Sequence, residues 1–314
     1  MNVRRRLIPA ALASALGLGA LTACSSDSAA SGNTDKFDVV ASFYPMAFLA
    51  EQIGGDHANV TSLTEPGQEP HDLEISTQQR AQLEEADAAL YLKGLQPAVD
   101  EAVTQTGIKT KIDAAALTTL ESRGTGGHTH EGEESTPEEE PARDLHVWLD
   151  PVKYSEVAEG VGKAFEKADP ENAADYRKNT AALVKKLNGL NSTFENGLKN
   201  TKTKVFFTNH AAFGYLAERY GLTQEAISGL DPESEPSGAR VRELQEEAKA
   251  DGVTTVFYET LVSDKTAKTL ARDANLKTDV LDPLEGITDK SRGDDYFQVM
   301  ESNLKALQTA LGAK

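Results

Sequence analysis

The segment that decides the fold is Arg143-Asp144-Leu145-His146-Val147-Trp148-Leu149-Asp150-Pro151, which contains the only tryptophan of the chain. His146 stands between apolar residues, and an Asp-Pro pair follows it. Asp150 suits the N-cap of a helix and Pro151 its first position, so the segment predicts an extended approach to a helix. A histidine at such a junction is well placed to face a cleft in an α/β fold.

Strand-like and helix-like stretches alternate on both sides of this segment. An apolar strand pattern at 37–42 leads into a helix pattern that begins at Tyr44-Pro45, and the same alternation returns from Lys204 onwards. Such alternation is typical of a parallel sheet with helices on both faces. We therefore predict an α/β fold of two doubly wound lobes, although no fixed-period sequence repeat relates the halves.

A long helix is expected between the two halves. Beyond Asp169-Pro170, Gly189 is the only helix breaker before Gly197, and apolar residues fall at helical spacing up to Leu198. A helix of about 28 residues would be about 40 Å long, which predicts a rigid connection. The expected boundaries are an N-terminal lobe at 37–168, a linking helix at 169–200 and a C-terminal lobe at 201–314.

The segment 124–141 interrupts the alternation. It is rich in glycine and glutamate and has no apolar side chains to bury, which predicts a disordered surface loop. His128 and His130 lie beside several glutamates in this loop. Two interpretations remain open: the loop collects metal ions weakly, or it is a solvated acidic loop with incidental histidines.

The N-terminal residues predict export and lipid anchoring. Residues 1–23 have a basic start and a short apolar run, as a signal peptide does. Pro9 interrupts the apolar run, which argues against a retained membrane-spanning helix. Cys24 is the only cysteine and follows Leu-Thr-Ala, so we expect it to be lipidated, the alternative being a stray cysteine near an ordinary cleavage site. Residues 24–36 read as a flexible tether.

The overall charge limits the class of partner. The formal net charge is −18 at pH 7. An acidic surface of this size argues against nucleic acid and anionic lipid as partners, and it raises the local concentration of cations.

Three histidines occupy comparable positions. His71 and His210, like His146, each follow a strand or an extended segment, and ligands of open α/β sheets bind beyond the carboxyl ends of strands. His210 is expected at a helix N-terminus, where the helix dipole favours the neutral, ligating imidazole. Each histidine taken alone reads as an ordinary hydrogen-bonded residue, but three in equivalent places favour a shared metal ion. Asp282 or Glu285, after a later strand, would complete a site that suits Zn2+ better than Mn2+.

The sequence lacks the motifs of common hydrolases. It has no His-Glu-x-x-His motif, no Gly-x-Ser-x-Gly elbow and no phosphate-binding loop. Glu259 could serve as a general base, although it reads more simply as a loop carboxylate. A metal with four protein ligands leaves no open position for a catalytic water, so we expect no enzyme.

Five motifs together resemble the zinc/manganese group of solute-binding lipoproteins that serve ABC importers. They are Phe43-Tyr44-Pro45, Glu69-Pro70-His71-Asp72, His146-Val147-Trp148-Leu149-Asp150-Pro151, Thr208-Asn209-His210-Ala211-Ala212-Phe213 and Leu281-Asp282-Pro283-Leu284-Glu285-Gly286. The resemblance covers nearly all of the chain beyond Cys24. It implies two lobes joined by one long helix, with metal held in the cleft between them.

The resemblance also implies the ligands and the function. The family's three histidine ligands match His71, His146 and His210. The fourth is the glutamate of the Pro-Leu-Glu-Gly loop in zinc members, here Glu285, and an aspartate aligned with Asp282 in manganese members. The expected protein is a monomeric zinc receptor, anchored outside the membrane through Cys24, that delivers Zn2+ to an ABC permease. A manganese receptor, a surface adhesin and, less favoured, a zinc hydrolase are the alternatives.

Overall fold

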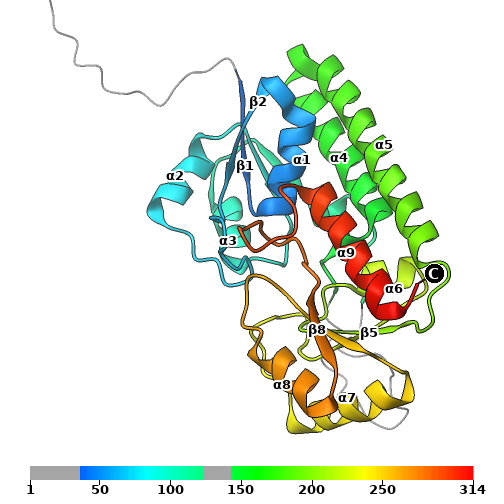
Figure 1. Cartoon of the computed structure of the whole chain (residues 1–314). Coiled ribbons are helices and arrows are strands. Elements are labelled where there is room, and N and C mark those ends of the chain that lie inside the picture. The colour runs from blue at the N-terminus through cyan, green and yellow to red at the C-terminus, as the bar shows by residue number, and fades with distance from the viewer. Residues whose placement is uncertain (1–35, 123–142, 314) are drawn as a thin grey trace, which may run out of the picture. The chain divides into compact units, whose positions relative to one another are not determined.

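Two four-stranded parallel sheets form the framework of the protein, each at the centre of one α/β lobe (Figure 1). The computed structural model describes residues 36–122 and 143–313. Several sequence-based predictions fall outside these residues: the signal peptide (1–23), Cys24, the tether (24–36) except its last residue, and the acidic loop (124–141) with His128 and His130.

The first lobe is built on the N-terminal sheet. Its elements are β1 (Phe37–Ala41), α1 (Tyr44–Gly54), β2 (Ala58–Ser62), α2 (Thr77–Glu85), β3 (Ala88–Tyr91), α3 (Pro97–Gln105) and β4 (Thr110–Asp113). The strand order is β2-β1-β3-β4, with every pair parallel. β1 is largely buried, as expected of a central parallel strand. Ser76 and Gln79 form a capping box that starts α2.

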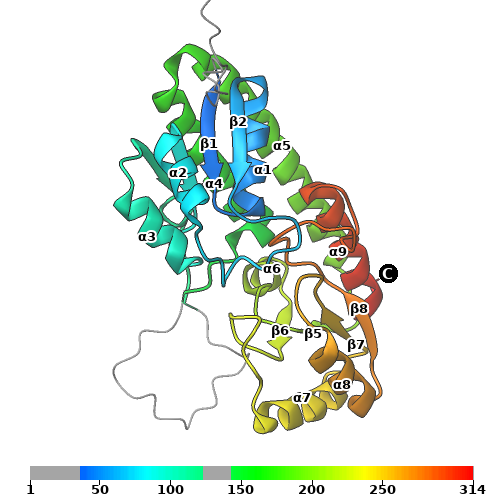
Figure 2. The same cartoon turned by 90° about the vertical axis from the view of Figure 1, so that its left-hand side faces the viewer.

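The second lobe repeats this plan. Its elements are β5 (Val205–Thr208), α6 (Gly214–Arg219), β6 (Thr223–Ala226), α7 (Gly238–Ala250), β7 (Thr255–Tyr258), α8 (Lys265–Ala274) and β8 (Lys277–Val280). The strand order β6-β5-β7-β8 is that of the first lobe, again with parallel pairs (Figure 2). The predicted pair of parallel α/β lobes is confirmed.

α4 (Pro151–Ala168) packs on α1 and β4 of the first lobe, and the long helix α5 (Ala173–Leu198) joins the lobes. α4 starts as predicted, because Asp150 Oδ1 accepts a hydrogen bond from Val152 N at 2.9 Å and Pro151 takes the first helical position. α5 has 26 residues, about 39 Å of helix. Pro170–Asn172 forms a 3-10 turn that runs directly into α5, so the segment expected to be one helix begins at Pro170 with a 3-10 turn and is α-helical from Ala173.

The last helix, α9 (Tyr296–Leu311), packs against α5 and so returns the chain to the connection between the lobes (Figure 1). α5 turns its leucines and Phe194 toward the core, as their helical spacing predicted. None of the helices in the described ranges combines the length and the apolar character needed to cross a membrane.

One apolar core runs through both lobes, and Trp148 lies within it. The Trp148 ring meets Phe43 edge to face, with 5.1 Å between ring centroids. Its Nε1 donates a hydrogen bond to Pro283 O at 2.7 Å, and Tyr296 Oη donates to Trp148 O at 2.7 Å. The segment quoted at the start therefore ties the first lobe to α9 and to the loop after β8.

Polar contacts join the same segment to α6 of the second lobe. The Arg219 guanidinium donates to both carboxylate oxygens of Asp150, over 2.8–3.0 Å. Tyr215 Oη donates to Asp144 O at 2.8 Å. Because these contacts are buried or half-buried, they support the expectation of a rigid connection.

Candidate metal centre

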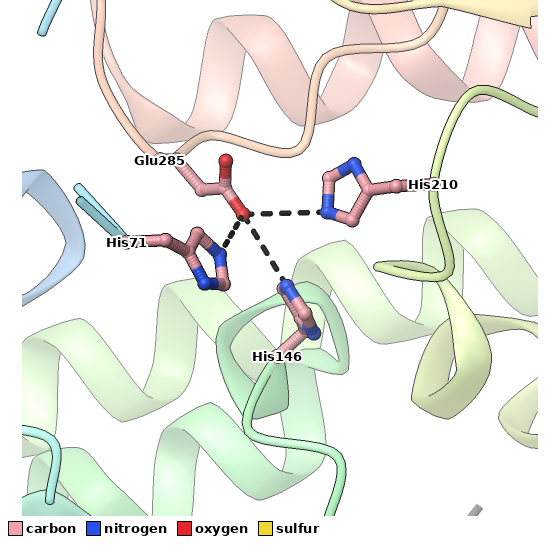
Figure 3. Close-up of side chains that lie close together, drawn as sticks. All are labelled: His71, His146, His210 and Glu285. Atoms are coloured by element: carbon pink, nitrogen blue, oxygen red, sulfur yellow. Dashed lines mark hydrogen bonds and ion pairs between the residues drawn. The ribbon is translucent and has the colours of Figure 1, made fainter. Parts of the chain in front are cut away.

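The four side chains predicted as ligands converge on one point (Figure 3). The Nε2 atoms of His71 and His146 each lie 3.3 Å from Glu285 Oε1, and His210 Nε2 lies 3.5 Å from it. One ligand atom from each residue lies within 4.8 Å of the other three. Both lobes contribute, since two of the residues precede α5 in the chain and two follow it.

His71 lies on the irregular loop between β2 and α2. Leu73 N donates to Pro70 O at 3.2 Å, and Asp72 N donates to Glu69 Oε2 at 3.3 Å. These bonds fold the chain into a tight turn around His71. Its ring then points at the carboxylate from the opposite lobe (Figure 3).

His146 is oriented by Asp144, two residues earlier. Asp144 Oδ1 accepts from the backbone N of His146 at 3.0 Å and from its Nδ1 at 2.8 Å. Because a carboxylate only accepts, Nδ1 carries the proton and leaves the Nε2 lone pair toward the centre. The extended approach to this residue is a single antiparallel bridge between Arg143 and Ser122.

His210 is oriented in the same way by Glu259. Its Nδ1 donates to Glu259 Oε1 at 2.7 Å, and Asn209 Nδ2 donates to the same oxygen at 3.1 Å. Glu259 follows β7 directly and is buried. Glu259 is a loop carboxylate, as expected, and in addition it is the hydrogen-bond partner of a candidate ligand.

The predicted helix N-terminus at His210 is also wrong. α6 begins at Gly214 with Phe213 as its N-cap, so His210 lies outside the helix and Asn209 does not cap it. The dipole argument for a neutral imidazole therefore fails. The ligating form is set by the hydrogen bond to Glu259, which fixes the tautomer.

The loop after β8 supplies Glu285 and holds Asp282 away from the cluster. Asp282 Oδ1 accepts from Leu284 N at 2.9 Å, which forms the Asx turn that an aspartate commonly makes with the backbone two residues on. Its Oδ2 accepts from Ser291 Oγ at 2.8 Å and from Thr260 Oγ1 at 3.3 Å. Among the described residues, the group able to hold a metal contains Glu285 and leaves out Asp282.

Charges inside the centre favour proton binding when no metal is present. Burial works against the ionised carboxylate of Glu285, but the three imidazoles outweigh it and hold its pKa well below the usual range. Burial likewise opposes the imidazolium of His146, yet Asp144 and Glu285 raise its pKa. Glu259 and Glu285 raise the pKa of His210 further. A metal ion that binds here must displace these protons.

The distances from the three nitrogens to the carboxylate oxygen match those expected around a small tetrahedral cation. With metal–ligand distances of about 2.0–2.1 Å, neighbouring ligand atoms of a tetrahedron lie roughly 3.3–3.4 Å apart. The three nitrogen–oxygen distances are 3.3, 3.3 and 3.5 Å. Within the described residues, Nε2 of His146 and of His210 is buried without a hydrogen-bond partner, although native proteins rarely bury unpaired polar atoms. A cation at the centre would satisfy both atoms.

The centre is enclosed on nearly every side. The side chains of His146, His210 and Glu285 are at most 1% exposed, whereas that of His71 is 16% exposed. An enclosed site whose four protein groups can fill a tetrahedral coordination shell suits the capture of an ion.

Asp144, which orients His146 in the structure, was not singled out from the sequence. It stands in the quoted segment, but nothing in the local pattern separated it from an ordinary loop aspartate. A usable signal was its place two residues before a candidate ligand, since ligating histidines usually donate their second ring nitrogen to a carboxylate or carbonyl.

Comparison with known proteins agrees with this geometry. Residues 39–310 match the model of the family described as zinc-uptake complex component A, periplasmic (ZnuA). The zinc-binding lipoprotein AdcA of Streptococcus pneumoniae is 38% identical over 296 residues, which cover 92% of this chain and 58% of the relative. The chain thus spans less than two thirds of that relative. The high-affinity zinc uptake system protein ZnuA of Bacillus subtilis is 34% identical over 95% of this chain and 98% of the relative.

Solved structures show the same fold. The Zn(II)-bound ZnuA-like domain of S. pneumoniae AdcA superimposes with a TM-score of 0.71 at 36% identity, over 88% of this chain and 99% of that one. The laminin-binding protein Lmb of Streptococcus agalactiae, described as bifunctional with adhesin and metal-transporting activity, gives a TM-score of 0.77 at 29% identity, over 88% and 99%. With the family match over residues 39–310, these likenesses show that the chain belongs to the ZnuA family of zinc-uptake components.

Proposed function

We propose that this protein captures Zn2+ on the extracytoplasmic side of a membrane and delivers it to an ABC-type permease. The observation that carries the proposal is the convergence of three imidazole nitrogens on one carboxylate oxygen at 3.3–3.5 Å. Membership of the ZnuA family supports it, as do the zinc-binding relatives.

The proposed ligands are His71, His146, His210 and Glu285. Carboxylates orient two of the histidines, and this arrangement is the usual support of a metal-bound imidazole. Asp282 is left out, because both of its oxygens accept hydrogen bonds within its own lobe.

Zinc is preferred over manganese as the cargo. Three nitrogen ligands and one oxygen suit Zn2+, whereas Mn2+ prefers more oxygen ligands. The Zn(II)-bound relative of the same fold supports this preference.

Metal titration of the purified protein tests the proposal. Stripped protein should bind one Zn2+ per chain and bind Mn2+ far more weakly in competition with a chromophoric chelator. A ligand at a thousandfold excess over its Kd adds roughly 4 kcal/mol to the free energy of unfolding, so Zn2+ should raise the melting temperature strongly. Alanine at His71, His146 or His210 should remove most of that gain. Preference for Mn2+, or a gain that survives all three substitutions, contradicts the proposal.

The function proposed is that of a receptor and not of an enzyme. The family is one of solute-binding components, and Asp144, Glu259 and Asp282 each accept hydrogen bonds from a histidine or from backbone and hydroxyl groups. Turnover of ester or peptide substrates by the zinc-loaded protein would show this part of the proposal to be wrong.

The anchoring and organisation are proposed on sequence grounds. We propose a monomer lipidated at Cys24, after removal of 1–23, with a tether at 24–36. The lobes at 37–168 and 201–314 are joined by the connection at 169–200, and His128 and His130 of the acidic loop remain accessory metal-ligand candidates. Relatives named as lipoproteins support an extracytoplasmic location.

Adhesion is the second candidate function, favoured by the likeness to Lmb. Binding of this protein to immobilised laminin, with and without Zn2+, would test it. Absence of saturable binding at micromolar protein would reject it while leaving the zinc proposal intact.

A further inference from the structure

The chain just ahead of Glu285 adopts a conformation that needs support. Leu284 has φ 58°, in the left-handed region that side chains other than glycine rarely occupy. Its side chain is fully buried, so packing fixes the residue in place. Because Leu284 directly precedes Glu285, its backbone conformation sets the direction in which the Glu285 side chain leaves the loop.

Asn303 of α9 supplies support through the main chain of Asp282. Asn303 Nδ2 donates to Asp282 O at 2.7 Å, and Asn303 Oδ1 accepts from Asp282 N at 2.9 Å. Leu284 N donates to the Asp282 carboxylate at 2.9 Å, and Trp148 Nε1 donates to Pro283 O at 2.7 Å. Hydrogen bonds thus hold each of the three residues that precede Glu285.

The position of Asn303 is otherwise unfavourable for a polar residue. It is buried on the apolar face of α9, where its helical neighbours Val299, Met300, Ala306 and Leu307 are buried too. A buried amide is costly unless it is hydrogen-bonded, and here both of its polar ends bond the backbone of the Glu285 loop. An apolar side chain would pack on this face without the cost of burying an amide. The role of the Asn303 amide is therefore to bond the backbone of the Glu285 loop.

We propose that Asn303 is a positioning residue for the fourth metal ligand. Because it bonds both backbone groups of Asp282, it holds the left-handed turn at Leu284. It thereby keeps Glu285 Oε1 at 3.3–3.5 Å from the three imidazole nitrogens. This inference rests on the proposed zinc function. It assigns a share of the affinity and of the coordination geometry to a residue that is not a ligand.

The test compares Asn303→Leu and Asn303→Asp with the wild-type protein. The first removes both hydrogen bonds, and the second keeps the size while losing the amide donor. Outer-shell partners of metal ligands contribute about 10–100-fold in affinity, so both variants should raise the Kd for Zn2+ by that factor. Co2+ serves as the spectroscopic probe: its visible absorption is intense in a tetrahedral site and should weaken and shift in both variants.

Leu307→Val on the same helix is the matched control for lost stability. It should lower the melting temperature of the metal-free protein while leaving the Zn2+ affinity and the Co2+ spectrum unchanged. The inference is overturned if the Asn303 variants keep the wild-type affinity and spectrum, or if Leu307→Val alters both to the same degree. Failure of the wild-type protein itself to bind Zn2+ would instead overturn the proposed function, and the inference with it.

Discussion

Replacing Glu259 by glutamine removes one charge beside His210 while keeping the size of the side chain. The Glu259 carboxylate accepts from His210 Nδ1 at 2.7 Å, and both residues are buried. A charge-assisted hydrogen bond is about twice as strong as a neutral one, so glutamine supports the imidazole less well. We expect Glu259→Gln to raise the Kd for Zn2+ about 10–100-fold in mildly alkaline buffer, which equals about 1.4–2.8 kcal/mol.

The loss of affinity should depend on pH with a definite sign. Although burial opposes it, the Glu259 carboxylate raises the pKa of His210 in the metal-free protein. Zn2+ must displace that proton, so the wild-type protein loses affinity as the pH falls through the raised value. Without the carboxylate the pKa of His210 is lower, so fewer protons compete in the variant. The difference in Kd for Zn2+ between the wild-type protein and Glu259→Gln should therefore become smaller as the pH falls.

Competition with a chromophoric chelator, from about pH 6 to about pH 8.5, measures both effects across the titration range of histidine. Glu225→Gln is the control: Glu225 is a buried carboxylate of the same lobe, paired with Arg240 at 2.6 Å and absent from the metal cluster. It should lower stability and leave the Kd unchanged. The reasoning is refuted if Glu259→Gln binds Zn2+ like the wild type in alkaline buffer, or if the difference widens toward acid.

The remaining predictions concern the fourth ligand, the metal-free centre, the acidic loop and the anchor. Glu285→Ala should weaken Zn2+ binding more than Asp282→Ala in chelator competition; the reverse order would indicate a manganese-type ligand set. In the metal-free protein, the raised pKa values of His146 and His210 add stability. This contribution is fully present below about pH 6.5 and is lost as the pH rises through the pKa values of the two histidines in the folded state. Calorimetry should thus show that mild acidification raises the melting temperature of the metal-free protein and reduces the increase in melting temperature caused by Zn2+. Melting temperatures of the metal-free and zinc-loaded proteins that change in parallel with pH would contradict this. Deleting 124–140 should preserve tight Zn2+ binding, and a large fall in metal-free melting temperature would show that the loop is structural. Cys24→Ser should release the protein from the membrane fraction, and retention after a salt wash would reject lipid anchoring.

Elements with self-contained local signals could be predicted from the sequence. Asp150 followed by Pro151 marks the start of α4, and Ser76 with Gln79 marks that of α2, because each cap is made by side chains within three residues of the bonds they satisfy. The convergence of ligands from both lobes was also predictable. The carboxyl ends of parallel strands meet at one edge of each sheet, and the family motifs indicate which residues of the loops there are ligands.

Features fixed by distant contacts could not be predicted in this way. Asn209 carries the local signal of an N-cap, but its amide donates to Glu259, and the helix starts only at Gly214. The hydrogen-bond partners of His210 and of Asp282 lie on other elements of the fold. No spacing pattern in the chain indicates these partners, so they become visible only once the chain is folded.

The two lobes share one strand order but carry their residues of the metal centre on different loops. This accounts for a duplicated architecture without a sequence repeat. In the second lobe, His210 follows β5 and Glu259 follows β7, so ligand and partner lie beyond neighbouring strands where the order reverses. In the first lobe, His71 follows β2 and His146 comes after β4 in the chain. The loops directly after β1 and β3 supply none of the four candidate ligands. The strand order fixes which loops reach the cleft, but it leaves open which of them carries a ligand. Selection for a metal centre can therefore act on a few loop residues in each lobe, and nothing in the fold requires equivalent positions to keep the same amino acids.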